Sequence, residues 1–186
     1  MMQVRLFVSL ISAVLLHGVA LAENAYPDDP QKLDQYLAAL HGSQDPAEAR
    51  QLETKIRLIW SRHADDEAVH RLSLASVSLQ SGDLKAAEPL LDTLVKDHPD
   101  FAEAWNRRAT LYYLQGRYEK SLSDIAKVLD LEPRHFGALS GRGACLRNLG
   151  RDAEALEAMK QAAALDPFIA GLGDAIKEME KKTPEL

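Results

Sequence analysis

The sequence predicts an all-α protein built as a right-handed superhelix of repeated helix pairs. Apolar residues recur at helical spacing through most of the chain. Glycines and prolines each recur with a step of 34 residues, at Gly82, Gly116 and Gly150 and at Pro99, Pro133 and Pro167. A mid-unit glycine suits a turn with positive φ, and a proline at the end of a unit stops a helix. Because one helix pair cannot bury its apolar stripe alone, the repeat predicts a stack of such pairs.

The segment 101–133 is the most complete copy of the repeat. Its pattern predicts two amphipathic helices joined by a turn at 115–117 and closed by Pro133. Small residues recur in register where the two helices of a unit would touch, at Ala75, Ala109 and Gly143 and at Ala87, Ser121 and Ala155. Large apolar residues recur with the same step of 34 residues, at Leu91, Ile125 and Met159. These registers divide the repeat region 67–169 into units 68–101, 102–135 and 136–169.

The N-terminal 22 residues have the layout of a secretory signal peptide. A cationic start containing Arg5 precedes an apolar run at 6–16 and the small-residue site Ala20-Leu21-Ala22. We expect cleavage between Ala22 and Glu23. The protein should therefore contact the membrane only through this segment, and only before cleavage. An uncleaved anchor is the alternative. Export is the localisation expected from this layout. The single cysteine, Cys145, excludes an internal disulfide.

Helical segments flank the repeats on both sides. Residues 23–66 are expected to form a linker and a degenerate helix pair, with helices starting at Asp29-Pro30 and Asp45-Pro46. We expect this pair to cap the N-terminal end of the array. Residues 170–186 are expected to form a C-terminal capping helix, starting near 167, and a tail.

These residues resemble the tetratricopeptide repeat (TPR) family, whose 34-residue unit has large and small residues, glycine and proline at set offsets. Unit 102–135 matches best, through Trp105, Ala109, Tyr112, Gly116, Tyr118, Ser121, Ile125 and Pro133. The layout also resembles small exported TPR proteins of Gram-negative bacteria, which implies that the protein is exported to the periplasm. Two features depart from the family pattern: Arg108 and Arg142 stand where leucine is usual, and Pro89 lies inside a predicted helix.

The resemblance implies that the first helix of each unit lines a concave groove. The groove positions it implies include Leu72, Leu79, Asn106, Thr110, Tyr113, Leu114, Arg147 and Asn148. We add Arg107, expected to be exposed near the groove. This mixture of apolar and neutral polar side chains suits a peptide or protein partner. Chaperone-tail clamps of the family use lysine and asparagine where this chain has Leu72 and Ser76, so that function is not expected.

Other classes of function find little support. A net charge of −6 without a cluster of basic residues argues against a nucleic-acid partner. The chain lacks a glycine-rich phosphate loop, a nucleophile elbow and an HExxH motif, so we expect no enzyme activity and no cofactor. His63 and His70 are two helical turns apart, about 10 Å of rise, so no metal site is expected. Cys145 is expected to be a small core residue.

The sequence leaves two alternative roles open for Arg108 and Arg142. Arg108 and Arg142 are one repeat apart, so their guanidiniums could bind one anionic group. Alternatively, Arg108 pairs with Asp124 on the facing helix, and we favour this ion pair. The predicted function is a non-catalytic, exported interaction module. The alternative is a self-associating structural subunit of the cell envelope, such as a homodimer through the end helices or the face around Trp60.

Overall fold

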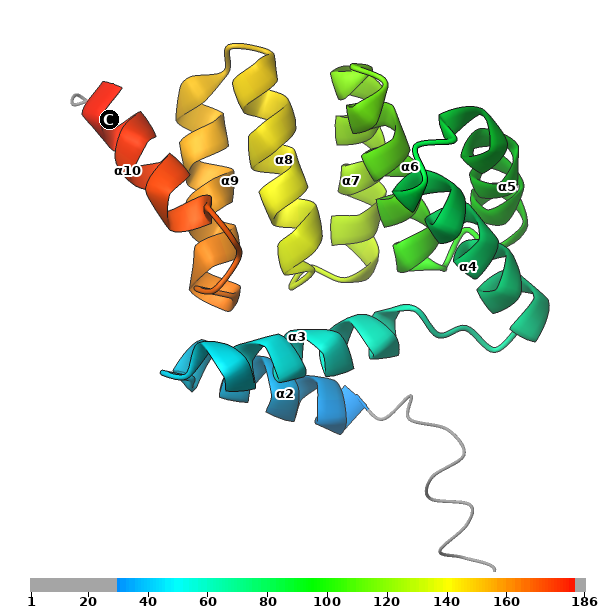
Figure 1. Cartoon of the computed structure of the whole chain (residues 1–186), viewed down its shortest axis with the longest axis horizontal. Helices are drawn as coiled ribbons and strands as arrows, with labels where there is room; N and C mark the ends of the chain where they lie inside the picture. The colour runs from blue at the N-terminus through cyan, green and yellow to red at the C-terminus, as the bar shows by residue number, and fades with distance from the viewer. Residues whose placement is uncertain (1–29, 183–186) are drawn as a thin grey trace, which may run out of the picture.

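The computed structural model describes residues 30–182, and these form nine α-helices without a strand (Figure 1). The all-α prediction is therefore confirmed. The signal segment predicted at 1–22 and its predicted cleavage site lie outside the described residues. Within 30–182, no helix is both long and apolar enough to cross a membrane. The helices are α2 (Pro30–Gly42), α3 (Pro46–Trp60), α4 (Asp66–Gln80), α5 (Leu84–Asp97), α6 (Ala102–Leu114), α7 (Tyr118–Leu131), α8 (Phe136–Asn148), α9 (Asp152–Leu165) and α10 (Leu172–Lys182).

Helices α4 to α9 form three antiparallel pairs that lie side by side, with α10 against the last pair (Figure 1). The turn glycines Gly82, Gly116 and Gly150 have φ values of 79°, 72° and 74°. A side chain at these positions would be strained, because L-residues rarely adopt positive φ. The prolines at 99, 133 and 167 each stand two residues after the last residue of α5, α7 and α9. Pro89 does not interrupt α5, which runs through it.

Small side chains let the helices of a unit approach closely. A Cβ added at Gly143 would lie 2.5 Å from Cγ of Met159 and 3.2 Å from the carbonyl oxygen of Ala155. The α8–α9 contact therefore requires glycine here. In the preceding unit the Ser121 hydroxyl donates to the carbonyl of Ala109 at 2.8 Å. Cys145 is fully buried and donates to the Ser121 hydroxyl at 3.2 Å, as its predicted core role requires.

The N-terminal helix pair does not stack on the first repeat as expected. Instead, α2 and α3 cross one edge of the stack, and α2 contacts α9 (Figure 1). His41 donates from Nδ1 to the carbonyl of Ala164 at 2.7 Å, and Arg134 pairs with Asp34 at 2.5 Å. The physical reason is a shared apolar cluster in which the buried residues of α2 and α3 join Phe136, Phe168 and Ile169.

This arrangement changes which surfaces are open. Trp60 is buried against Phe136 and His135, so the face around Trp60 is not available for self-association. The outer face of α4, which the N-terminal pair was expected to cover, instead leaves Leu74 and Val77 exposed by 45% and 60%.

The last helix also differs from its predicted start near 167. Residues 167–171 form turns, and α10 begins at Leu172. Gly171 adopts a φ of 73°, which a continuous right-handed helix cannot accommodate. Phe168 and Ile169, within these turns, pack into the cluster that holds α2 and α3.

Candidate functional site: a groove on α6 and α8

The first helices of the second and third repeats border a concave cavity of about 240 Å³. The cavity walls are mostly small residues, which leaves room for the side chains of another molecule. The hydroxyls of Thr110 and Ser140 and the amide of Asn106 add neutral polar groups to this surface. The lining is Asn106, Ala109, Thr110, Tyr113, Ser121, Ile125, Gly137, Ala138, Ser140, Gly141 and Ala144.

A second cavity, of about 220 Å³, continues the groove toward α3. It shares Asn106, Thr110, Gly137 and Ser140 with the first cavity. Arg57 and Trp60 of α3 and Ile169 form part of its wall. The two cavities together are called the α6–α8 groove below. The N-terminal helix pair thus closes one end of this groove.

A buried carboxylate, Glu103, organises that closed end. Its Oε1 pairs with Arg107 at 2.6 Å, and its Oε2 accepts from Asn106 at 2.9 Å. His135 lies 3.1 Å from the same Oε2. The backbone N–H of Ala138 donates to Nδ1 of His135 at 3.1 Å, so Nε2 carries the proton that is donated to Glu103. His135 therefore both caps α8 and binds Glu103.

These partners decide the charge of Glu103. Burial by itself would raise the pKa of the carboxyl group. The hydrogen bond from His135, the positive charge of Arg107 and the hydrogen bond from Asn106 outweigh burial and lower the pKa of Glu103 below its ordinary value. Glu103 is therefore ionised at neutral pH, and its oxygens are occupied by groups of the same chain.

Two buried donors at the closed end of the groove have no acceptor among the described residues. They are Nε1 of Trp60 and Nε of Arg107. Both side chains line the second cavity. A buried N–H without a partner is unfavourable, so each of these two groups is destabilising unless an acceptor reaches it.

The structure brings together four of the groove residues predicted from the sequence. Asn106, Thr110 and Tyr113 line the first cavity, and Arg107 lines the second. Leu114 is exposed by 52%, at the end of α6, and lines neither cavity. The central unit therefore supplies all four of the predicted residues that line these two cavities.

The other predicted groove residues lie elsewhere. Leu72 is buried, and Leu79 packs against the same core cluster with Phe101 and Leu111, because these apolar side chains pack inward between α4 and its neighbours. Arg147 lines a separate cavity beside Glu178 and Met179 of α10. The Asn148 side chain donates to the carbonyl of Ala144 on its own helix at 2.8 Å. Leu72 is thus a core residue and not a groove residue.

The predicted pair between Arg108 and Asp124 is confirmed. Nε and Nη2 of Arg108 donate to the two carboxylate oxygens of Asp124 at 2.8 and 2.9 Å. Nη1 of Arg108 also donates to Asp92 at 3.0 Å. These acceptors, Asp124 first, raise the pKa of Arg108. This guanidinium is therefore committed to carboxylates of its own chain.

Two important residues of the groove were missed by the sequence reasoning. His135 is not among the groove residues predicted from the sequence, yet it is buried and binds Glu103. The sequence singles out Trp60 only under the alternative function, as the centre of a self-association face. The repeat register holds a signal for His135, because position 135 is equivalent to that of the aromatic, buried Phe101. Among residues 30–182, no group of three or more His, Cys, Asp or Glu side chains is arranged to hold a metal ion.

The fold and the groove define the class: a stack of helix-turn-helix repeats with a concave surface on the first helices. Comparison with known proteins places this chain within that class. The family model described as tetratricopeptide repeat matches residues 72–130 and 115–168. A TPR repeat-containing protein of Rhizobium etli is 41% identical over 138 residues, which are 74% of this chain and 68% of that protein. The chain belongs to the tetratricopeptide repeat family.

More distant relatives share parts of the chain. Tetratricopeptide repeat protein 28 of mouse is 28% identical over 118 residues, which are 63% of this chain and 5% of that protein. The first TPR domain of Spaghetti (RPAP3), solved with an HSP90 peptide, superposes with a TM-score of 0.62 at 18% identity, covering 66% of this chain and 98% of the domain. MamA superposes with a TM-score of 0.55 at 21% identity, covering 82% of this chain and 85% of its own. These solved structures share the fold.

Proposed function

We propose that this protein is a non-catalytic interaction module that binds a peptide segment of a protein partner in the α6–α8 groove. The observation that carries the proposal is the continuity of the two cavities, which small and neutral polar residues line and which end at two unpaired buried donors. The residues that we expect to contact the peptide are Asn106, Arg107, Thr110 and Tyr113. The peptide is expected to place an apolar side chain over the small residues of α8 and an acceptor near Trp60 and Arg107.

The neighbouring folds support peptide binding as the use of such a surface. The Spaghetti domain was solved with the HSP90 peptide SRMEEVD, and a TPR domain of yeast Sti1 in a complex with Hsp70. The present groove offers chiefly neutral and apolar groups, and Glu103 at its closed end is already occupied. We therefore expect a less acidic segment than SRMEEVD in this groove. We also propose that binding follows export to the periplasm, as residues 1–22 indicate.

Filling the groove tests the proposal. A Cβ at Gly141 would meet only Cδ1 of Ile125, at 3.6 Å, so Gly141→Leu is tolerated sterically at its Cβ and directs its side chain into the first cavity. Peptides selected by display on the wild-type protein should bind Gly141→Leu and Tyr113→Ala at least about tenfold more weakly. Lys85→Leu, an exposed position on α5, is the matched control and should bind normally. Equal binding to Gly141→Leu at unchanged thermal stability would contradict the proposal.

The uncovered face of α4 favours a second candidate, a self-associating envelope subunit. Leu74 and Val77 form an exposed apolar surface where a further repeat would stack. Light scattering over a concentration series distinguishes the two functions. A dimer that Val77→Lys converts to monomer would support self-association, and a monomer at all concentrations would exclude it.

A further inference from the structure

The repeat places Arg108 and Arg142 at equivalent positions but surrounds them differently. Arg108 binds Asp92, 16 positions before it, and Asp124, 16 positions after it. The corresponding neighbours of Arg142 are Ala126 and Ala158. The third repeat therefore keeps the arginine and replaces both of its carboxylate partners with methyl groups.

Arg142 accordingly has no bonded partner within the described part of the chain. Its charge acts on the nearby Glu154, whose pKa is lowered first by the hydrogen bond from Arg151 and only to a smaller extent by Arg142. Residues 30–182 offer its guanidinium neither an ion pair nor a hydrogen bond, and it is exposed, whereas Arg108 is largely enclosed. Arg151, the other arginine nearby, already binds both carboxylate oxygens of Glu154 at 2.7 Å each.

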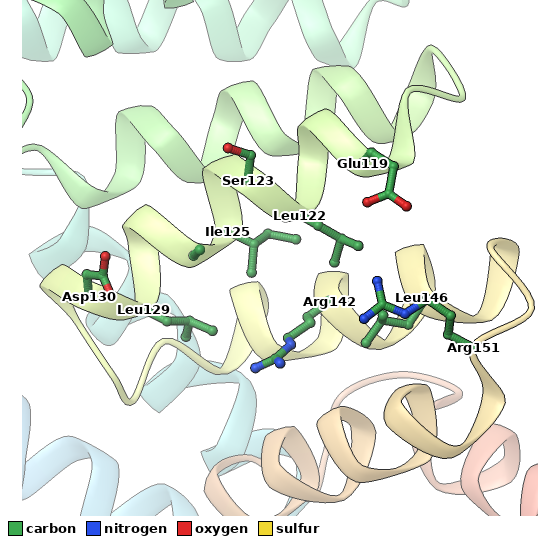
Figure 2. A pocket seen from close by; sticks show the side chains of 10 residues that line it. Glu119, Leu122, Ser123, Ile125, Leu129, Asp130, Arg142, Leu146 and Arg151 are labelled. Carbon is green, nitrogen blue, oxygen red and sulfur yellow. The ribbon is translucent and has the colours of Figure 1, made fainter.

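A cavity lies at each of the two positions, Ala126 and Ala158, where the third repeat lacks a carboxylate. A cavity of about 500 Å³ between α7 and α8 is lined by Ala126 and Arg142. A second cavity, of about 280 Å³, between α8 and α9, is lined by Ala158 and Arg142. Figure 2 shows Arg142 on the α8 side of the larger cavity, with Ile125 and Leu129 of α7 across from it.

The larger cavity pairs the guanidinium of Arg142 with an apolar wall. Leu122, Ile125, Leu129 and Leu146 supply this wall. Its two acidic residues, Glu119 and Asp130, stand at opposite ends of α7, separated by roughly 16 Å of helical rise (Figure 2). The smaller cavity adds the carboxylates of Glu154, which Arg151 holds, and of Glu157. A bound carboxylate next to Arg142 would therefore take the place that Asp92 or Asp124 takes beside Arg108 in the preceding repeat.

We propose that Arg142 and the larger cavity form a second binding site, which receives a carboxylate of a peptide partner. The guanidinium would donate two parallel hydrogen bonds, as Arg108 does to Asp124, while an adjacent apolar side chain packs on Ile125 and Leu129. Arg142 points roughly 150° around α8 from the mean direction of the groove residues 137, 140, 141 and 144, at 100° per residue. The site is thus on the other side of α8 from the α6–α8 groove, shares only Ile125 with its lining, and does not depend on the function proposed for that groove.

Short peptides with and without carboxylates test this site on the full chain. The probes are acetyl-Leu-Asp-Leu-amide with its asparagine counterpart, and acetyl-Leu-Leu as free acid and as amide. Titrations followed by NMR of backbone amides and arginine Nε–H groups report affinity and position. We expect the carboxylate probes to shift the Arg142 Nε–H and the α7 and α8 amides at millimolar concentrations. The asparagine and amide probes should have little effect. The aspartate and free-acid arms show whether a side chain or a C-terminus is preferred.

Variants separate this site from the groove. Arg142→Gln should weaken the carboxylate probes at least about tenfold, and Arg142→Lys less, because lysine keeps the charge without the planar fork. Ala126→Asp, which restores the carboxylate that Asp92 provides in the second repeat, should also block the probes, whereas Ala126→Asn should not. Groove-selected peptides should bind all these variants normally. Equal binding of the carboxylate probes to Arg142→Gln, or no shift of α7 and α8 amides by any carboxylate probe, would overturn the proposal.

Discussion

The imidazole of His135 stacks on the indole of Trp60, with ring centroids 4.0 Å apart and planes inclined by 16°. Three residues further along, His63 stacks on Phe101 with centroids 4.9 Å apart. Because Phe101 and His135 are one repeat apart, the end of α3 and the following link place two rings on equivalent positions of successive units. This aromatic pairing fixes the N-terminal helices across the edge of the stack.

We expect Trp60→Ala to release the N-terminal helix pair. The change removes a large buried ring and leaves a cavity, so the free energy of unfolding should fall by about 3 to 5 kcal/mol. Hydrogen exchange should accelerate mainly in α2 and α3, while α6 and α7 stay protected. Leu58→Ala, at an exposed position of the same helix, is the control and should change stability by no more than about 0.5 kcal/mol. Uniform acceleration over all helices would contradict a local role for Trp60.

The sequence predicted the repeat region well because its signals are local and periodic. Positive φ at Gly116 and a helix end before Pro133 depend on the residue itself and its neighbours along the chain. The Arg108–Asp124 pair was also predictable, since both residues face each other within one helix pair. Such contacts repeat with the register and need no knowledge of distant segments.

The placement of α2 and α3 could not be obtained in the same way. Their apolar stripes specify that something is buried, but not which surface covers them. The partner is Phe136, where the preceding repeat has the small Ala102, together with residues of the link after α9. This long-range choice also made Trp60 and His135 part of the groove. Leu72 was misplaced because its position follows the groove register, while its apolar side chain is buried in the core.

We expect Arg108 and Asp124 to be strongly coupled in stability. Arg108→Leu restores the residue usual in the family but leaves the buried Asp124 carboxylate without its main partner. The free energy of unfolding should therefore fall by about 3 kcal/mol. Arg108→Leu combined with Asp124→Ala should recover much of that loss, which a double-mutant cycle in denaturant measures directly. Additive effects of the two changes would show that the bidentate pair contributes little.

Because Glu103 is ionised, the free energy of unfolding should depend on pH in the acid range. Its pKa is lowered in the folded protein, so its contribution is complete above its ordinary pKa of 4.5 and is lost as the pH falls through the lower folded value. Glu103→Gln should therefore flatten the loss of stability that begins as the pH falls below about 4.5. At neutral pH the variant should be less stable by about 1 to 3 kcal/mol, because the charge-assisted bonds from Arg107 and His135 weaken. Urea unfolding at several pH values measures both effects, and parallel profiles for the two proteins would argue against an ionised Glu103.

The pKa of Asp166, at the junction between α9 and α10, is shifted in the opposite direction to that of Glu103. Its Oδ1 accepts from the backbone of Phe168 at 2.9 Å, while Oδ2 is buried with no partner among the described residues. Burial raises the pKa of this carboxyl group, and the bond from Phe168 and the charge of Arg57 lower it only in part. A raised folded pKa means that stability decreases as the pH rises from the ordinary pKa through the folded one, and the full cost is present at neutral pH. Asp166→Asn keeps the acceptor for Phe168 and removes the charge, so it should raise the free energy of unfolding at pH 7 by about 1 kcal/mol and give no gain near pH 3. Thermal unfolding at the two pH values measures the difference, and a loss of stability at pH 7 would mean that a donor reaches Oδ2 in solution.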